Sequence, residues 1–163
     1  MSKHHAPLER ASLDGKALEE LVALLNQSLA DTLDLAYQTK QAHWNVKGPN
    51  FYGLHLLFDE LHIQLSTTVD DLAERAVTLG GQAIGTIRAA GNASDLQEYP
   101  LEAKKSMVHV NALVDRYSDY THRVRQAIRK AEKLGDQVTA ELYTSICGAM
   151  DKALWMLTAH QEA

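Results

Sequence analysis

Helix-breaking residues are concentrated at a few places in this chain, and the segments between them are long. Proline occurs only at positions 7, 49 and 100, and six of the nine glycines lie at 48, between 80 and 91, or at 135. Because proline and glycine are the strongest local signals for a turn, the chain is divided into a few long segments. This division favours long helices over a fold of many short strands.

Apolar residues recur every three or four positions within these segments, which is the period of one helix face. We expect helices over about 15–46, 51–79, 101–134 and 137–160, with Asp14 as the N-cap of the first. The connections are short, long and short, and the long one, 82–102, has room for one short helix. A long link lets the second and third long helices run parallel, so we expect an all-α four-helix bundle of the ferritin-like type, with one long crossover.

Length and composition fit one ordinary domain with a short tail. The 163 residues are 45% hydrophobic and 23% charged, as in soluble globular proteins. Residues 1–15 have no apolar period, so we interpret them as an N-terminal tail before a single domain over 16–163. The N-terminus lacks the apolar core of a signal peptide. The one cysteine, Cys147, excludes an internal disulfide, and both features favour the cytoplasm.

The second predicted helix carries an unusual number of side chains that can bind a metal. His55 and Asp59 are four residues apart, and so are Asp70 and Glu74, which puts each pair on one helix face. The step from 59 to 70 is almost three helical turns, so all four share a stripe about 100° wide. A solvated polar face with ordinary ion pairs is the alternative interpretation, and the helix alone does not decide between the two.

Helix geometry limits how this stripe can bind a metal. The midpoints of the two pairs, residues 57 and 72, are fifteen residues apart, which is roughly 22 Å along a helix. Metal–ligand bonds are only about 2 Å long, so one chain cannot bring both pairs to one metal. Two copies of the helix, packed antiparallel about a two-fold axis near residues 64 and 65, would place 57 opposite 72 and create two identical sites.

His43, near the end of the first predicted helix, adds another neutral nitrogen. Two histidines with several carboxylates suit Fe(II), which accepts nitrogen and oxygen ligands, better than a closed zinc site rich in cysteine and histidine. A di-iron site inside one bundle needs Glu-x-x-His on two helices, and this chain contains no such motif. A zinc-binding structural or sequestration protein with the same ligands remains an alternative.

The same residues carry a family resemblance. Over about residues 16–160 the chain resembles the Dps family of mini-ferritins, on Gln41-Ala42-His43-Trp44-Asn45, Gly48-Pro49-Asn50-Phe51, His55-x-x-x-Asp59, Asp70-x-x-x-Glu74-Arg75 and Gly80-Gly81. The ligand spacings of twelve, four, eleven and four match the family's ferroxidase motif without a gap. Tyr99-Pro100, and Asp151-Lys152 with Leu154-Trp155, are also similar to that family.

The resemblance implies a hollow homododecamer in which two-fold dimers share metal sites. Such a protein oxidises Fe(II), preferentially with hydrogen peroxide rather than oxygen, and stores ferric mineral in a central cavity. This activity protects the cell against Fenton damage. Iron, as Fe2+ and Fe3+, is the cofactor that the family implies. By the same resemblance, His43, His55 and Asp59 come from one subunit, and Asp70 and Glu74 come from its two-fold mate.

Several other residues have candidate roles. Trp44 follows a ligand directly and is either an interceptor of one-electron oxidants beside the iron or a packing aromatic. Asp136 and Glu141 open the last long helix, where carboxylates are ordinary partners of the helix dipole. In mini-ferritins this region lines a three-fold pore, so both are also candidates for iron entry. His4 and His5 in the tail are a further candidate metal pair.

Many family members bind DNA through a lysine-rich tail, and here the sequence departs from that pattern. The first sixteen residues carry Lys3, Arg10 and Lys16 against Glu9 and Asp14, and the whole chain has a net charge of -5. We therefore expect DNA binding to be weak, non-specific and weakened further by salt. A DNA-compacting, nucleoid-associated protein with minor ferroxidase activity is the alternative function.

The polar stripe of the second helix, which serves no purpose in a monomer, leads to a prediction about assembly. The purified protein should elute in gel filtration at about twelve times its chain mass of 18.1 kDa. A stable monomer with full ferroxidase activity would contradict both the predicted dodecamer and the shared site.

Overall fold

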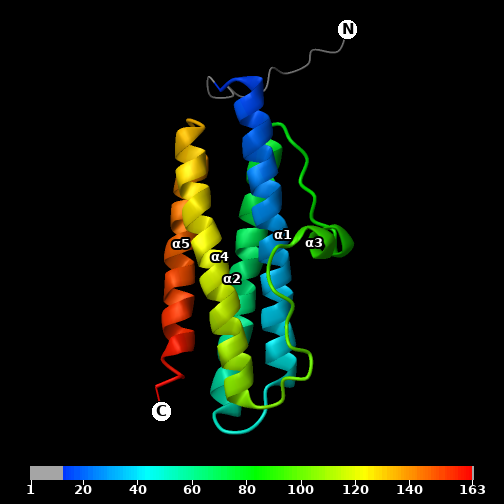
Figure 1. Ribbon diagram of the computed structural model, residues 1–163, viewed down its shortest axis with the longest axis vertical. Helices are drawn as coiled ribbons and strands as arrows, with labels where there is room; N and C mark the ends of the chain where they lie inside the picture. Colours follow the sequence, from blue (N-terminus) through cyan, green and yellow to red (C-terminus); the bar gives the residue numbers. More distant parts are fainter. Residues whose placement is uncertain (1–12, 163) are drawn as a thin grey trace.

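The structure, a computed structural model, describes residues 13–162. Within that range it contains no strand and five helices, α1 (Gly15–Asn45), α2 (Phe51–Thr78), α3 (Ile87–Ala93), α4 (Ser106–Lys133) and α5 (Gln137–Thr158). Figure 1 shows α1, α2, α4 and α5 side by side in one bundle, with α3 standing outside it. The predicted four-helix bundle with one short extra helix is confirmed.

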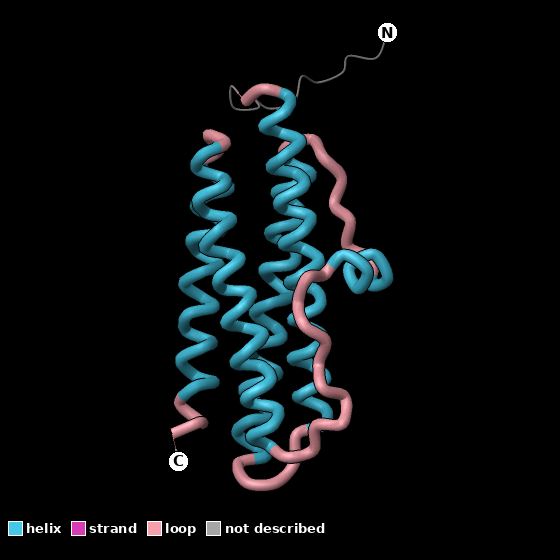
Figure 2. Tube along the Cα trace, viewed as in Figure 1, coloured by secondary structure: helices cyan, strands magenta, loops and turns pink. Residues whose placement is uncertain are grey.

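The order of the helices follows from the lengths of the connections. The short turn after α1 makes α2 antiparallel to it, and the short turn after α4 does the same for α5 (Figure 1). Residues 79–105 return along the outside of α1 to the other end of the bundle, as the pink tube in Figure 2 shows. Helices α2 and α4 therefore run parallel, as predicted from the long crossover.

Two of the predicted helix boundaries are wrong. Helix α4 begins at Ser106 rather than near 101, because the carbonyl of Pro100 accepts a hydrogen bond from the Ala103 amide (3.0 Å) and closes a turn. Lys105 then has extended backbone angles as the N-cap. Helix α5 ends at Thr158, two residues before the predicted end. The Asp14 N-cap is confirmed, since its carboxylate accepts a hydrogen bond from the Ala17 amide at 2.8 Å.

Three fully buried tyrosines set the distance between the two halves of the bundle. Tyr117 and Tyr120 on α4, and Tyr143 on α5, each share a hydrogen bond with a hydroxyl of α1, at 3.1, 2.6 and 2.9 Å. The partners on α1 are Thr39, Thr32 and Ser28. Because a buried hydroxyl without a partner is costly, these three bonds favour one register of α1 against α4 and α5. Burial raises the pKa of all three phenols.

Two carboxylates of α1 hold the crossover in place. The buried Asp31 accepts a hydrogen bond from the Asp95 amide at 2.9 Å, and Asp34 accepts one from the Ser94 hydroxyl at 2.6 Å. Burial raises the pKa of Asp31, although its hydrogen bonds act in the opposite direction. The segment that follows α3 is thus attached to the middle of α1.

Two further features of the described chain concern its cysteine and its helix hydropathy. Cys147 is buried on α5, as a core thiol would be, and burial raises its pKa. Within residues 13–162 no helix is both long enough and apolar enough to cross a membrane. The predicted tail lies outside the described residues except for 13–15, and His4 and His5 lie outside them altogether.

Candidate metal centre

His43 and His55 face each other where α1 ends and α2 begins. The Nδ1 atom of His43 lies 2.7 Å from the carbonyl oxygen of His55, and the Nδ1 atom of His55 lies 2.9 Å from the carbonyl oxygen of His43. The two rings are stacked, with centroids 3.8 Å apart and planes 20° from parallel. Two residues that are twelve apart in the sequence therefore form one compact pair.

These two hydrogen bonds determine which nitrogen of each ring carries the proton. A carbonyl oxygen can only accept, so both Nδ1 atoms must be donors. In the neutral ring the lone pair is then on Nε2, and neither Nε2 atom has a hydrogen-bond partner among residues 13–162. A backbone carbonyl that orients the second nitrogen is the usual support of a histidine that binds a metal. This arrangement leaves both Nε2 atoms free to act as nitrogen ligands.

The tight turn after α1 makes this pairing possible. Gly48 has a φ of 95° and Asn50 a φ of 61°, and both values lie in the left-handed region that glycine and asparagine tolerate best. The backbone reverses between Val46 and Phe51, so the last turn of α1 lies against the first turn of α2. The motif Gly48-Pro49-Asn50 thus makes the turn that brings the two histidines together.

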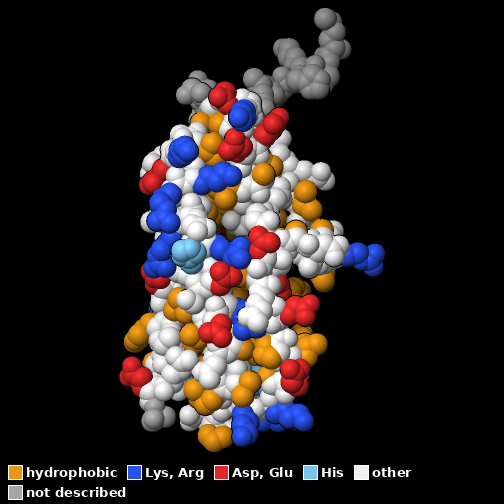
Figure 3. Space-filling view, viewed as in Figure 1, with side chains coloured by type: hydrophobic (Ala, Val, Ile, Leu, Met, Phe, Trp, Pro, Cys, Tyr) orange, Lys and Arg blue, Asp and Glu red, His pale blue; other side chains and the backbone are white. Residues whose placement is uncertain are grey.

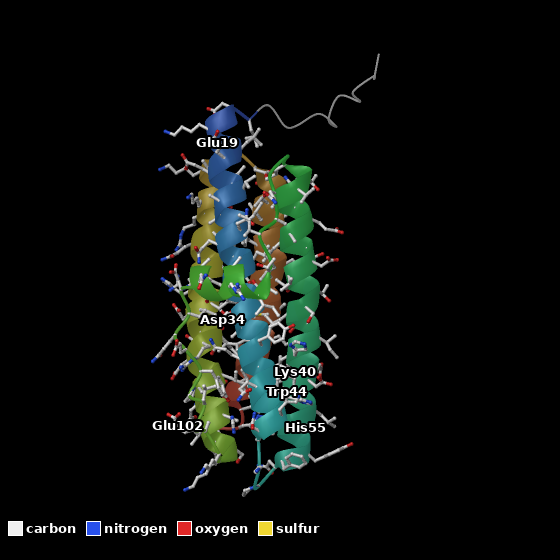
Figure 4. The ribbon with its side chains drawn as sticks, turned by 90° about the vertical axis from the view of Figure 1, so that its right-hand side faces the viewer. Glu19, Asp34, Lys40, Trp44, His55 and Glu102 are labelled. Carbon is white, nitrogen blue, oxygen red and sulfur yellow. The ribbon has the colours of Figure 1, made fainter. Side chains whose placement is uncertain are left out.

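Asp59 lies one turn along α2 from His55 and forms an ion pair with Lys40 of α1. The hydrogen bond from the Lys40 ammonium is the main cause that lowers the pKa of Asp59, so this carboxylate is ionised. Figure 4 shows Lys40, Trp44 and His55 close together at the same end of the bundle. The sequence analysis missed Lys40, although it precedes His43 by three residues and therefore shares its helix face.

Asp70 and Glu74 are exposed on the far half of α2, in the part that follows its midpoint. No group of three or more histidine, cysteine, aspartate or glutamate side chains converges on one point within residues 13–162. His43, His55 and Asp59 therefore do not converge on one point in the described structure. The two ligand pairs of α2 also lie apart, as the rise of a helix requires. The predicted ligand set therefore stays a prediction, with three of its residues near the turn between α1 and α2 and two on the far half of α2.

Comparison with known proteins assigns the family. A family model described as a ferritin-like domain matches residues 22–163. The "DNA protection during starvation protein" of Agrobacterium fabrum is 41% identical over 148 residues, which are 91% of each chain. The protein of the same name from Brevibacillus brevis is 33% identical over 147 residues, 90% of this chain and 98% of that one. This chain belongs to the Dps family.

Solved Dps structures have the same fold. The Mycobacterium smegmatis Dps superimposes with a TM-score of 0.89 at 32% identity, over 94% of this chain and 93% of that one. A Vibrio cholerae Dps, described as a member of a broad superfamily of ferritin-like diiron-carboxylate proteins, gives a TM-score of 0.88 at 27% identity. That match covers 99% of this chain and all of the other. The ferritin-like fold predicted for this Dps chain is confirmed.

Trp44 and His62, two ring-bearing side chains near the candidate centre, differ in exposure. Trp44 is 61% exposed, so in this Dps subunit it does not pack into the core of its own chain. His62 is half-buried, and its Nδ1 donates to the carbonyl of Ala36 at 2.9 Å. Its ring lies 6.0 Å from that of Tyr37 in an edge-on arrangement. His62 therefore has the fixed orientation of a structural residue, and Trp44 is available to a second subunit or to solvent.

The two pore candidates have different surroundings. Asp136 is 2% exposed, and both of its carboxylate oxygens accept hydrogen bonds from one nitrogen of Arg75, at 2.9 and 2.7 Å. Thr139 also donates to it. Within this chain its charge is already paired, whereas Glu141 is exposed. The pore role of both residues stays a prediction, and Glu141 is the one whose carboxylate faces solvent.

The Arg75–Asp136 pair yields a prediction about stability. Asp136→Asn should lower the free energy of unfolding by about 2–4 kcal/mol at pH 7, because Arg75 would keep a largely buried charge without its counter-ion. Burial alone raises the pKa of Asp136, but the bonds from Thr139 and Arg75 outweigh it and lower the pKa below 3.8. The ionised Asp136 therefore stabilises the folded protein fully at a pH above 3.8, the ordinary pKa of an aspartate. This stabilisation is lost as the pH falls through the lower pKa that Asp136 has in the folded state.

Urea unfolding followed by circular dichroism at several pH values between about 7 and 3 tests this. The wild type should lose more stability toward acid pH than the variant does. The matched control is Asp151→Asn, because Asp151 also accepts two bonds from one nitrogen of an arginine, Arg125, but on the surface. We expect less than about 1 kcal/mol for that control. Equal losses in the two variants would contradict the assignment.

Proposed function

We propose that this Dps chain forms a homododecamer that oxidises Fe(II) with hydrogen peroxide at centres shared between two subunits. The ferric product is stored as mineral in the central cavity. The main support is the fixed tautomer of His43 and His55, whose Nε2 atoms face away from their backbone partners. Asp59 lies one turn further along α2 with an ionised carboxylate. Two neutral nitrogens beside a carboxylate suit a ferrous ion.

Fe(II) is the substrate in this scheme, and the residues supply charge and position. Two Fe(II) ions give two electrons to one hydrogen peroxide, and with two protons the products are two Fe(III) and two waters. Asp59, with Asp70 and Glu74 from the second subunit, stabilises the higher charge of Fe(III), which favours oxidation. Because the peroxide receives both electrons at one fixed centre, no hydroxyl radical is released.

An exposed apolar seam on α2 supports the two-fold pairing. Leu56, Ile63 and Val77 are 49%, 61% and 56% exposed, and they lie at intervals of seven and fourteen residues. Asp70 occupies the position between Ile63 and Val77 in the same heptad spacing. An apolar stripe with this period is typical of a helix that packs against a second helix. An axis near residues 64 and 65 would place Val77 opposite Tyr52 of the second copy.

Lys40 binds one oxygen of Asp59, so its positive charge competes with a metal cation for this carboxylate. We therefore expect Lys40→Gln to raise the affinity of the centre for a divalent cation by about two- to fivefold, the range for an ion pair near the surface. Zn2+, which is not oxidised, is the probe, added under calorimetry to the metal-free oligomer. The control is Lys47→Gln, an exposed lysine in the turn just beyond that end of α1, without an ion pair among residues 13–162. An unchanged Zn2+ affinity in Lys40→Gln would rule out this competition.

The shared centre itself can be tested by complementation. Asp59→Ala and Glu74→Ala each damage every site of a homo-oligomer, because every site uses both residues. When the two variants are co-assembled, random pairing makes about half of the dimers mixed, and each mixed dimer has one site with intact ligands. Peroxide-dependent Fe(II) oxidation, followed by absorbance, should therefore recover to roughly a quarter of the wild-type rate.

A matched control uses two lesions from the same half of the ligand set. Asp59→Ala co-assembled with His55→Ala should recover no activity, because neither kind of mixed site receives both intact residues. Native mass spectrometry verifies mixing in both experiments. Oligomers of Asp59→Ala and Glu74→Ala that mix fully and stay as slow as their parents would show that the centre does not form between subunits.

Weak DNA binding is the second proposed activity. Relatives of this chain carry the name "DNA protection during starvation protein". On the described surface, the last two turns of α4 present Arg129, Lys130 and Lys133, all of them exposed, against Glu132. Figure 3 shows blue side chains along this helix with red ones among them. This mixture, on a chain of net charge -5, supports only weak, salt-sensitive contact with phosphates.

A further inference from the structure

A pocket of about 470 Å³ lies between the turn that follows α1 and the start of α4. Its wall comes from residues 47–49 of the turn and from residues 104–107, at which α4 begins. Figure 2 shows these two stretches of loop at the lower end of the bundle. None of the candidate metal ligands and neither of the pore candidates lines the pocket. It is therefore separate from the features described so far.

All charged side chains of this pocket wall are basic. Lys47, Lys104 and Lys105 are exposed, and none of them forms an ion pair with a residue between 13 and 162. No carboxylate lines the pocket, and Glu102, the nearest in sequence, lies outside its wall. Figure 3 shows blue side chains, which are lysine or arginine, gathered at this end of the molecule. Three positive charges around one pocket attract an anion.

The first turn of α4 adds donors that lack an acceptor. The amides of Ser106 and Met107 donate to no backbone carbonyl among residues 13–162, and no side chain caps them. Lys105, the N-cap, has no side-chain oxygen, and the first turn contains no acidic residue. Free amides at the start of a helix carry partial positive charge and are suited to bind the oxygens of a phosphate.

Ser106 provides a hydroxyl that is unpartnered and can be reached from the pocket. The residue is only 6% exposed, and its Oγ forms no hydrogen bond with residues 13–162. The unpaired polar atoms that are sealed from solvent belong to Gln38, His109 and Arg116, so the Ser106 hydroxyl retains some accessible surface. Since Ser106 lines the pocket, that surface faces it. A largely buried hydroxyl without a partner indicates a place for a ligand atom, because most buried polar groups are paired.

We propose that this pocket binds a phosphate group. Lys47, Lys104 and Lys105 supply the counter-charge, as lysines do in other phosphate sites. The Ser106 hydroxyl and the free amides of α4 donate hydrogen bonds to the phosphate oxygens.

Two sources present the same phosphate oxygens, namely free inorganic phosphate and the backbone of a DNA strand. Binding of free phosphate is independent of both proposed functions, because it uses no residue of the metal centre and no DNA. Binding of a DNA phosphate rests on the proposed DNA binding and gives it a defined contact. Separate experiments therefore address the two sources.

The first experiment tests free phosphate. Inorganic phosphate is titrated by calorimetry into the metal-free wild-type oligomer at low ionic strength, with chloride as the control anion. We expect phosphate to bind in the millimolar range or tighter, and chloride not to bind. Ser106→Ala leaves every charge in place and should weaken phosphate binding about threefold to tenfold, the range for one hydrogen bond. Lys104→Gln combined with Lys105→Gln should weaken it about tenfold.

The matched control for net charge is Arg88→Gln combined with Lys152→Gln. Both side chains are exposed, lie outside the pocket wall and have no ion pair among residues 13–162. This pair of substitutions should change phosphate binding by less than about twofold, since distant exposed charges are screened. Circular dichroism verifies that every variant folds.

The second experiment repeats the comparison with a short DNA duplex, followed by fluorescence anisotropy. If the pocket takes a DNA phosphate, Ser106→Ala and the Lys104–Lys105 double variant weaken duplex binding more than the control pair does. If it takes only free phosphate, the duplex binds equally to Ser106→Ala and to the wild type, while the phosphate titration responds. The proposal is overturned if Ser106→Ala weakens the binding of neither ligand. Equal losses in the two double variants for both ligands, which would reflect only the net charge, also overturn it.

Discussion

The length of α2 is the constraint on which the rest of this molecule depends. It is one uninterrupted helix of 28 residues, and its ligand-type side chains lie on one stripe at two distant places. Since a helix rises about 1.5 Å per residue, no choice of side-chain rotamers brings the two ligand pairs to one metal ion. Under the proposed function, one chain therefore has only part of each site, and a second copy completes it. The exposed heptad of Leu56, Ile63 and Val77 on the same helix fits that completion.

The turn between α1 and α2 brings together the two histidines of the proposed centre. The positive φ values at Gly48 and Asn50 return the chain sharply enough for His43 and His55 to bond to each other's backbone carbonyls. The proton positions follow from those bonds, and so does the direction of each lone pair. Lys40 meanwhile neutralises Asp59 in the absence of metal, so the half-site does not carry an uncompensated charge. Position, tautomer and charge are therefore all settled by local contacts between two helices.

Buried polar contacts hold the crossover against α1. The hydroxyls of Thr32, Thr39 and Ser28 bind the core tyrosines, and Asp31 and Asp34 bind the amide and hydroxyl groups of the crossover. These contacts satisfy nearly every buried polar group along α1. The exception there is Gln38 Oε1.

The sequence by itself determined the number of long helices, their order and the residue types of the candidate centre. The apolar period and the few turn signals were enough to predict the bundle, because both depend only on near neighbours in the chain. The separation of His55 and Asp59 from Asp70 and Glu74 also followed from spacing alone, because helix rise is the same in every protein. The start of α4 was misplaced, since the turn closed by the Pro100 carbonyl interrupts no apolar pattern.

Only the tertiary structure decided which groups meet across helices. Nothing in the spacing of Lys40 and Asp59, or of Arg75 and Asp136, requires them to pair, because each contact joins two elements whose relative rotation depends on the whole core. The tautomers of His43 and His55 and the unpaired oxygen of Gln38 are likewise properties of packing. Periodicity reports which face of a helix is buried, but contact partners depend on how several such faces fit together in space.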